Sequence, residues 1–230
     1  MKKIAIFVAL FCTILILNAS EEHEMVLKSQ KQAGIIIIDP SHGGRDPGAT
    51  VAQMINGERI NLMEKDITLD IAVLLKEQIL KLNPNIRVIL TREEDEFVSL
   101  EKRTEIANSV YFNDDNKAIY ISIHANYSLN LNERGYEIYM NNDRIDNIKN
   151  RLFAEAVSME FENTFGDSLP FRGIKQADFF ILRNVQMPVI IAEIGFLSNL
   201  EDIKLINTRE GLEKYASTLS RGIIAYMASH

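Results

Sequence analysis

The sequence contains one cysteine and no tryptophan. Cys12, the single cysteine, lies in an apolar run near the N-terminus, so the rest of the chain has no thiol. This absence excludes a disulfide-stapled scaffold, a cysteine-ligated zinc site and a cysteine nucleophile. Histidine is also scarce, with four residues in 230. Each histidine in an ordered position is therefore a candidate for chemistry.

An excess of positive charge is absent too. The chain has 25 Lys and Arg against 32 Asp and Glu, a formal net charge of −7. We therefore expect no binding to nucleic acid, and no basic stripe indicates a helix that lies on a membrane surface. The hydrophobic fraction of 47% is ordinary for a globular domain.

The N-terminus has the pattern of a secretory signal peptide. Lys2 and Lys3 precede an apolar run over residues 4–17, which the small residues Asn18, Ala19 and Ser20 follow. The run is shorter than the roughly 20 residues that span a membrane. Because Leu17 suits cleavage after Ala19 poorly, an uncleaved signal anchor that tethers the protein to the membrane is the alternative.

These features divide the chain into three parts. We predict a signal peptide or signal anchor over residues 1–19, a linker over 20–34 and one folded domain over 35–230. The linker is too short to fold alone as a domain. We expect an exported protein, in the periplasm, the cell envelope or the extracellular space, and we expect it to be a monomer.

Strands and helices alternate from Ile35 onward. Predicted strands cover residues 35–39, 87–91, 118–124, 135–140, 179–183 and 189–194. Predicted helices cover residues 64–82, 100–110, 148–165 and 210–228. This alternation is typical of an α/β fold, here a single domain with a mixed, largely parallel twisted sheet flanked by helices.

Two histidines share one kind of position. His42 and His124 each stand at the carboxyl end of a strongly apolar strand, where ligand sites gather in open α/β sheets. His23 lies in the predicted linker and His230 is the last residue, so we expect neither to be held rigidly. A lone histidine at a strand end often only forms a hydrogen bond, but two at equivalent positions favour a shared role.

Two imidazoles suit zinc, and a catalytic zinc ion usually has three protein ligands and an open position. Without cysteine, the third ligand would be a carboxylate or another histidine. Glu64, which begins the predicted helix over residues 64–82, is the natural candidate, although acids in a first helical turn commonly just complement the helix dipole. Glu193 ends a buried strand, where a carboxylate is costly unless it is paired or metal-bound. A structural salt bridge is the alternative for Glu193.

Several sequence blocks, in order, resemble one family. They are IIIDPSHGGRDPGA, EKDITLDIA, VILTREEDEFVSLEKRTEIAN, ISIHAN, RGYEIY and RGIKQADFFILRNVQMPVIIAEIGFLSN. In these blocks the chain resembles the zinc-dependent N-acetylmuramoyl-L-alanine amidases of bacterial cell walls, over residues 35–228. The resemblance implies that residues 35–230 form the catalytic domain of a peptidoglycan hydrolase.

The same resemblance implies the roles of the site residues. Zinc (Zn²⁺) would be held by His42, Glu64 and His124. Glu193 would be the catalytic carboxylate, which takes a proton from water and passes it to the departing amine. The family pattern selects Glu64 over its neighbours Glu58 and Asp66, and Glu58 is a minor alternative ligand.

The expected reaction is cleavage of the amide bond between the lactyl group of N-acetylmuramic acid and L-alanine of the stem peptide. Asn126 and Arg172 are candidate substrate contacts, with a structural role as the alternative for each. A second hypothesis is a zinc peptidase or deacylase that acts on another wall-derived amide. A third is a non-catalytic wall-binding module, against which the retention of all four site residues argues.

Two departures from the family pattern lead to further expectations. Ser41 stands where the family usually has glycine, so a left-handed backbone at that position would be strained. Some members also carry a long helical insertion after the strand corresponding to residues 135–140. Here only residues 141–150 separate that strand from the body of the next helix, which predicts an open groove without an autoinhibitory helix.

Overall fold

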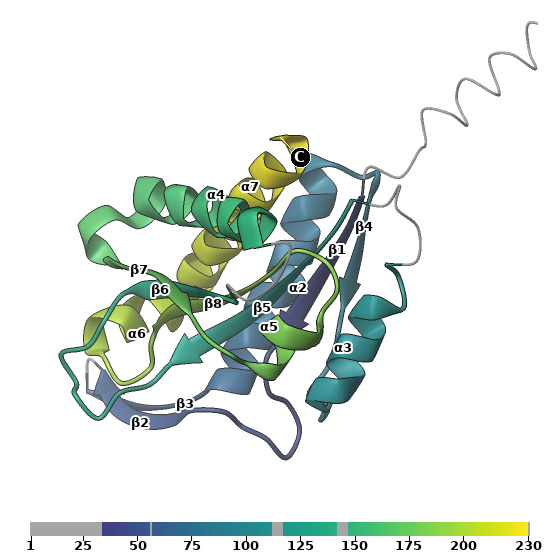
Figure 1. Ribbon diagram of the computed structural model, residues 1–230. Coiled ribbons are helices and arrows are strands. Elements are labelled where there is room, and N and C mark those ends of the chain that lie inside the picture. Colours follow the sequence, from purple (N-terminus) through teal and green to yellow (C-terminus); the bar gives the residue numbers. More distant parts are fainter. Residues whose placement is uncertain (1–33, 56, 112–116, 142–146, 230) are drawn as a thin grey trace, which may run out of the picture. The chain divides into compact units, whose positions relative to one another are not determined.

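The structure is a computed structural model that describes residues 34–55, 57–111, 117–141 and 147–229 (Figure 1). The predicted signal segment lies outside these residues, and so does the predicted linker except for Gly34, which begins the first strand. None of the helices within the described ranges is both long and apolar enough to cross a membrane.

A six-stranded sheet forms the centre of the domain. Its strands are β1 (Gly34–Pro40), β4 (Ile86–Leu90), β5 (Ala118–Asn126), β6 (Tyr136–Met140), β7 (Phe171–Gln176) and β8 (Val189–Phe196). Their order in the sheet is β4-β1-β5-β8-β6-β7. Only the β6–β8 pair is antiparallel among these neighbours. The predicted mixed, largely parallel sheet is therefore confirmed.

Helices cover both faces of the sheet (Figure 1). The long helices α2 (Glu64–Leu82), α4 (Asn147–Phe165) and α7 (Arg209–Ser229) pack on one face, and α3 (Leu100–Asn108) and α5 (Phe180–Asn184) pack on the other. The short helix α6 (Leu200–Ile206) and the 3₁₀ turn η1 (Gly166–Ser168) complete the helical elements within the described residues.

The isoleucine run of β1 is buried on both sides. Ile36 and Ile38 point into the core beneath α2, α4 and α7, whereas Ile35 and Ile37 belong to the core beneath α3 and α5. A strand covered on both faces needs apolar side chains at every position, which is why it shows no polar alternation. β1 is thereby fixed at the centre of the fold, next to both β4 and β5.

One predicted strand is wrong. Residues 179–183 fall on the short helix α5, with Phe179 as its N-cap residue. A short apolar run fits either a strand or a helix. Here only Ile181 and Leu182 are buried, while Phe179 is 46% exposed. The edge of the sheet is occupied instead by β7, which was not predicted.

A hairpin precedes α2 and was also not predicted. Strands β2 (Thr50–Ile55) and β3 (Glu58–Met63) pair in antiparallel register, with Thr50 opposite Met63. This pairing returns the chain from the loop after β1 to the first residue of α2. The hairpin therefore joins two segments that the functional site needs.

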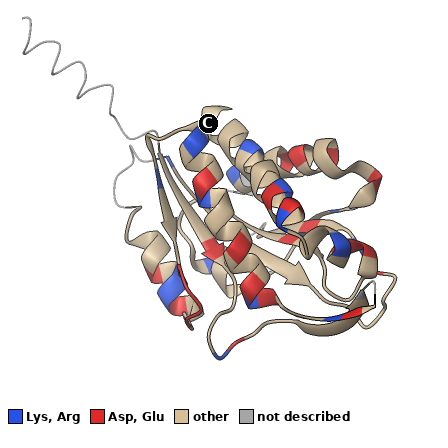
Figure 2. Cartoon of the chain, turned by 180° about the vertical axis from the view of Figure 1, so that it is seen from behind, with Lys and Arg blue, Asp and Glu red and all other residues tan. Residues whose placement is uncertain are grey.

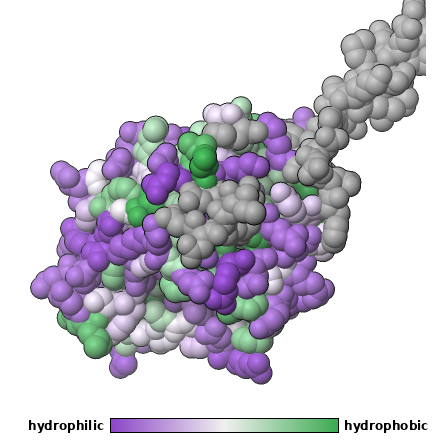
Figure 3. Space-filling model, viewed as in Figure 1, coloured by the Kyte–Doolittle hydropathy of each residue, from purple (hydrophilic) through white to green (hydrophobic). Residues whose placement is uncertain are grey.

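The outer surface is mainly polar. Figure 2 shows Lys and Arg interspersed with Asp and Glu along the helices rather than gathered in one stripe. The face in Figure 3 is mostly hydrophilic, with small separate hydrophobic areas. The larger apolar side chains are mainly in the two cores.

Candidate metal centre

The connections of the sheet define where a site forms. From β1 the chain passes through α2 to β4 on one side, then through α3 to β5 on the other side of β1. The carboxyl ends of β1 and β5 therefore face a topological switch point, the usual place for a site in such sheets. His42 follows β1 there, and His124 lies near the end of β5.

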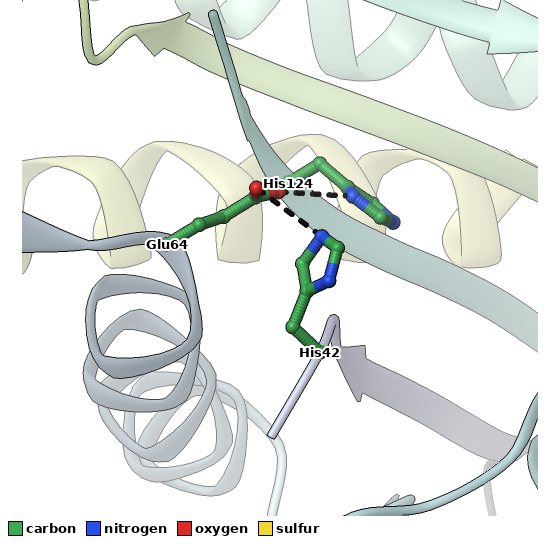
Figure 4. Close-up of side chains that lie close together, drawn as sticks. All are labelled: His42, Glu64 and His124. Atoms are coloured by element: carbon green, nitrogen blue, oxygen red, sulfur yellow. Dashed lines mark hydrogen bonds and ion pairs between the residues drawn. The ribbon is translucent and has the colours of Figure 1, made fainter. Parts of the chain in front are cut away.

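Glu64 comes to the same place through the hairpin. Its backbone N–H donates to the Ala49 carbonyl at 2.9 Å, and its Oε2 accepts the Ala49 N–H at 2.9 Å. Figure 4 shows the three side chains converging, with the carboxylate of Glu64, at the start of α2, directed toward both imidazoles.

The three side chains offer a compact set of donor atoms. One ligand atom from each of His42, Glu64 and His124 lies within 4.8 Å of the other two. His42 Nε2 is 3.2 Å from Glu64 Oε2, and His124 Nδ1 is 3.1 Å from Glu64 Oε1. The two rings meet edge to face, with centroids 5.4 Å apart. The structure thus brings the three predicted ligands together.

The charges of the three groups stabilise one another. Burial would raise the pKa of Glu64, but hydrogen bonds and charge from His124 and His42 outweigh it and hold that pKa well below its usual range. Burial opposes the charged form of His42, yet Glu64 and Asp46 raise its pKa to about 8. Glu64 likewise raises the pKa of His124 against the effect of burial.

Neighbouring groups orient the ligands. Asp46 Oδ2 lies 2.9 Å from His42 Nδ1, which leaves Nε2 to face Glu64. The buried Ser41 hydroxyl donates to Glu64 Oε1 at 3.4 Å, and the Ala125 N–H donates to the same oxygen at 3.1 Å. Such outer contacts fix the ring orientation and the carboxylate of a metal site.

The concern about strain at Ser41 applies instead to the next residue. In the described part of the chain, His42 is the non-glycine residue with positive φ, at 60°. Ser41 avoids the left-handed region and contributes a hydroxyl that glycine could not supply.

Glu193 shares a cleft with the three ligands. This cleft has a volume of about 390 Å³, and Asn126, Tyr127 and Phe180 are also among its lining residues. Glu193 stands opposite His124 in the parallel register of β5 and β8. Its Oε2 is buried and has no hydrogen-bond partner among the described residues. Burial raises the pKa of Glu193 to about 7, with the charges of Glu64 and Glu137 adding to the rise against those of His124 and His42.

A second buried carboxylate, Glu137, lies beside Glu193 in the antiparallel register of β6 and β8. Asn126 Nδ2 donates to Glu137 Oε1 at 3.0 Å, and Arg172 Nε donates to Oε2 at 2.9 Å. Lys175 also contacts Oε2. Asn126 lines the cleft, whereas Arg172, which also pairs with Glu133, is not among the lining residues.

The alternative ligands lie outside the cluster. Glu58 is exposed at the turn end of the hairpin, opposite Ile55 in the β2–β3 register. Asp66 is exposed on α2 and lines a different depression, next to Asp70 and Arg209. Neither belongs to the group of three that could hold a metal ion.

Sequence reasoning missed Asp46 and Glu137. For Asp46 the signal was its spacing of four residues from His42 inside a glycine-rich turn. For Glu137 the signal was the one that identified Glu193, namely an acidic residue inside an otherwise apolar strand. Neither signal says which partner the acid meets, because that depends on the turn and on the pairing of β6 with β8.

The predicted absence of a helical plug concerns the connection after β6, which the structure describes only in part. β6 ends at Met140 and α4 begins at Asn147. Residues 142–146 of this connection lie outside the described residues.

Comparisons with known proteins identify the family. Residues 36–225 match the family model described as N-acetylmuramoyl-L-alanine amidase. The chain is 31% identical to the sporulation-specific N-acetylmuramoyl-L-alanine amidase of Bacillus subtilis, over 82% of this chain and 66% of that protein. It is 30% identical to the uncharacterized protein YqiI of B. subtilis, over 83% of this chain and 84% of that protein.

Solved structures show the same fold. The N-acetylmuramoyl-L-alanine amidase AmiC2 of Nostoc punctiforme superposes with a TM-score of 0.72 at 32% identity, covering 85% of this chain and 98% of that one. An N-acetylmuramoyl-L-alanine amidase of Clostridium difficile 630 gives a TM-score of 0.73 at 28% identity, covering 86% and 99%. The chain belongs to the N-acetylmuramoyl-L-alanine amidase family and is, by that membership, a peptidoglycan hydrolase of the amidase class.

Proposed function

We propose that this protein is a zinc-dependent amidase that cleaves the bond between the lactyl group of N-acetylmuramic acid and L-alanine of the stem peptide. The observation that carries the proposal is the convergence of His42, Glu64 and His124 within 4.8 Å, in the same cleft as Glu193. Family membership supplies the class of substrate.

The donor set fits zinc. Two imidazole nitrogens and one carboxylate are the protein ligands of many catalytic zinc sites, which keep one position open for water or substrate. Calcium and magnesium prefer oxygen ligands alone, so the two imidazoles disfavour them. The carboxylate of Asp46 on His42 Nδ1 is the outer partner that a zinc-binding histidine usually has.

When bound, zinc would supply a Lewis acid that polarises the scissile carbonyl and makes water a better nucleophile at neutral pH. The protein's own residues handle the proton. Glu193 takes a proton from the attacking water and delivers it to the nitrogen of L-alanine as the carbon–nitrogen bond breaks. A pKa of about 7 suits both halves of this transfer.

The products are a lactyl carboxylate on the glycan and a free amine on the peptide. Asn126 lies on the cleft wall, where its side chain would contact the substrate. Arg172 would act on the substrate indirectly, because its guanidinium donates to Glu137, which in turn accepts a hydrogen bond from Asn126. Residues 1–19 would direct export and 20–34 would link that segment to the domain, so the enzyme would act in the cell envelope.

The proposal is tested with the zinc-loaded protein and two variants. Glu193→Gln removes the proton acceptor, so it should bind zinc normally and lower kcat by about 10²–10⁴-fold. His124→Ala should lose both zinc and activity. Wild-type activity in Glu193→Gln would contradict the assigned role. A wild-type protein that binds zinc but digests no peptidoglycan would favour a non-catalytic wall-binding module.

A peptidase or deacylase would use the same zinc ligands and the same carboxylate. Only the products separate it from an amidase. An amidase releases peptides with free L-alanine amino termini and leaves intact glycan strands.

A further inference from the structure

His42 has an unusual backbone for a metal ligand. Its φ of 60° lies in the left-handed region, and Gly43 and Gly44 continue with positive φ. Residues other than glycine avoid this region and persist there when surrounding contacts fix them. Something must therefore hold the chain at His42 in place.

Two buried arginines contact the backbone at this point. Arg103 donates from Nη2 to the His42 carbonyl at 2.5 Å and from Nη1 to the Pro40 carbonyl at 2.8 Å. Arg92 donates from Nε to the Pro40 carbonyl at 3.0 Å and from Nη2 to the Ser41 carbonyl at 2.9 Å. Three successive carbonyls that lead into the site are thus all held by guanidinium groups.

Arg92 also contacts the backbone segment that carries Glu64. Its Nη2 donates to the Lys65 carbonyl at 2.7 Å, one residue after Glu64. One guanidinium nitrogen therefore joins the residue before His42 to the residue after Glu64. The rigid guanidinium plane fixes these two carbonyls relative to each other.

The arginines are themselves fixed. Arg92 is 2% exposed and Arg103 is 3% exposed. Arg103 Nη1 pairs with the buried carboxylate of Asp39 at 2.5 Å, and Asp39 also accepts from the Ser122 hydroxyl at 2.7 Å. These contacts tie Arg103 to β1 and, through Asp39, to β5, whereas Arg92 is tied to β1 through the Pro40 carbonyl.

We propose that Arg92 and Arg103 are positioning residues that preorganise the metal centre. Arg103 holds His42 in its left-handed conformation, and Arg92 sets the separation between the segments that carry His42 and Glu64. This inference rests on the zinc site of the proposed function. It predicts that the two arginines control metal affinity although neither touches the metal ligands' side chains.

The test measures zinc affinity of the purified full chain by competition with a chromophoric chelator. Arg92→Met and Arg103→Met should each weaken zinc binding by about 10–100-fold, the usual effect of losing an outer contact of a metal site. The visible absorption of bound Co²⁺, which reports coordination geometry, should change in both variants.

Arg134→Met is the matched control. Arg134 pairs with another fully buried carboxylate, Asp202, at 3.5 Å. Its loss also removes a cationic partner from a buried carboxylate, yet zinc affinity and the Co²⁺ spectrum should stay as in wild type. If a methionine variant does not fold, Arg92→Lys or Arg103→Lys replaces it, since lysine keeps the charge and loses the planar fork.

Folded Arg92 and Arg103 variants that bind zinc as tightly as wild type, with an unchanged Co²⁺ spectrum, would overturn the inference. Equal loss of affinity in Arg134→Met would overturn it too, because the effect would then be general destabilisation. A wild-type protein that binds no zinc refutes the proposed function itself, so the two failures are distinguishable.

Discussion

Gly48→Ala probes how tightly the loop after β1 is packed against the metal ligands. Gly48 has φ of +64°, a conformation that alanine adopts only with strain. An added Cβ would lie 2.5 Å from Glu64 Oε2 and 2.7 Å from His42 Cδ2. Both distances are shorter than real Cβ contacts, so the two ligand side chains must move.

The expected effect has two separable parts. The left-handed backbone alone should cost about 1–2 kcal/mol of folding stability. Displacement of Glu64 and His42 should weaken zinc binding by about 10–100-fold, as for other losses of ligand orientation.

Gly166→Ala separates these parts. Gly166 also has positive φ, +48°, but no heavy atom of the described residues lies within 4 Å of its added Cβ, its chain neighbours aside. The Gly166→Ala variant should lose about as much folding stability as Gly48→Ala does through its backbone alone, and it should keep the zinc affinity of wild type. Urea unfolding of the metal-free proteins measures the first quantity, and chelator competition measures the second. Equal zinc affinity in Gly48→Ala and Gly166→Ala would refute the reasoning.

Three further predictions concern stability. Asp39→Asn leaves Arg103 buried without its counter-charge and should cost about 3–5 kcal/mol at neutral pH. Burial raises the pKa of Asp39, but Arg103, Thr91 and Ser122 outweigh burial and lower that pKa. The difference in unfolding free energy between wild type and Asp39→Asn should therefore be full above the ordinary value of 3.8 and shrink as pH falls below it. Urea unfolding across that range checks this, and a constant difference would contradict it. Replacing Ser41 with glycine, the residue usual in the family, should destabilise the fold by about 1 kcal/mol, because Ser41 is not left-handed and its hydroxyl contacts Glu64. A higher Tm for Ser41→Gly than for wild type, measured by calorimetry, would contradict this. Zinc at about 100 times its Kd should add roughly 2.7 kcal/mol of stability, reversed by a chelator, and no such shift should occur in His124→Ala.

The centre of the fold was predictable because its sequence signals are local. The apolar runs that precede His42, His124 and Glu193 mark strands that are buried on both faces. The carboxyl ends of parallel neighbours meet at one edge of the sheet, and the structure does bring these side chains to one cleft.

The periphery was harder because long-range contacts decide it. The run at residues 179–183 fits a strand or a helix, and it falls on the helix α5, whose Ile181 and Leu182 pack into the core on one face of the sheet. The β2–β3 hairpin had a local signal in Asn56-Gly57, a pair typical of tight hairpin turns. The alternation of strands and helices did not predict it.

The contacts of the residues that surround the metal ligands could not be predicted from the sequence. The contacts of Arg92 with Ser41 and Lys65 join segments that lie 51 and 27 residues apart along the chain. Glu137 meets Glu193 only because β6 runs antiparallel to β8, an exception in a mostly parallel sheet. Charge and spacing in the sequence do not predict these contacts, because the contacts depend on the order of the strands in the sheet.

The most direct test of the central claim is product analysis of a peptidoglycan digest made with the zinc-loaded enzyme. Mass spectrometry and amino-terminal labelling should find stem peptides with free L-alanine amino termini, and glycan strands whose lactyl groups are freed as carboxylates. Glu193→Gln should give little of either product. Release of other amines, with L-alanine still attached to the lactyl group, would contradict the account.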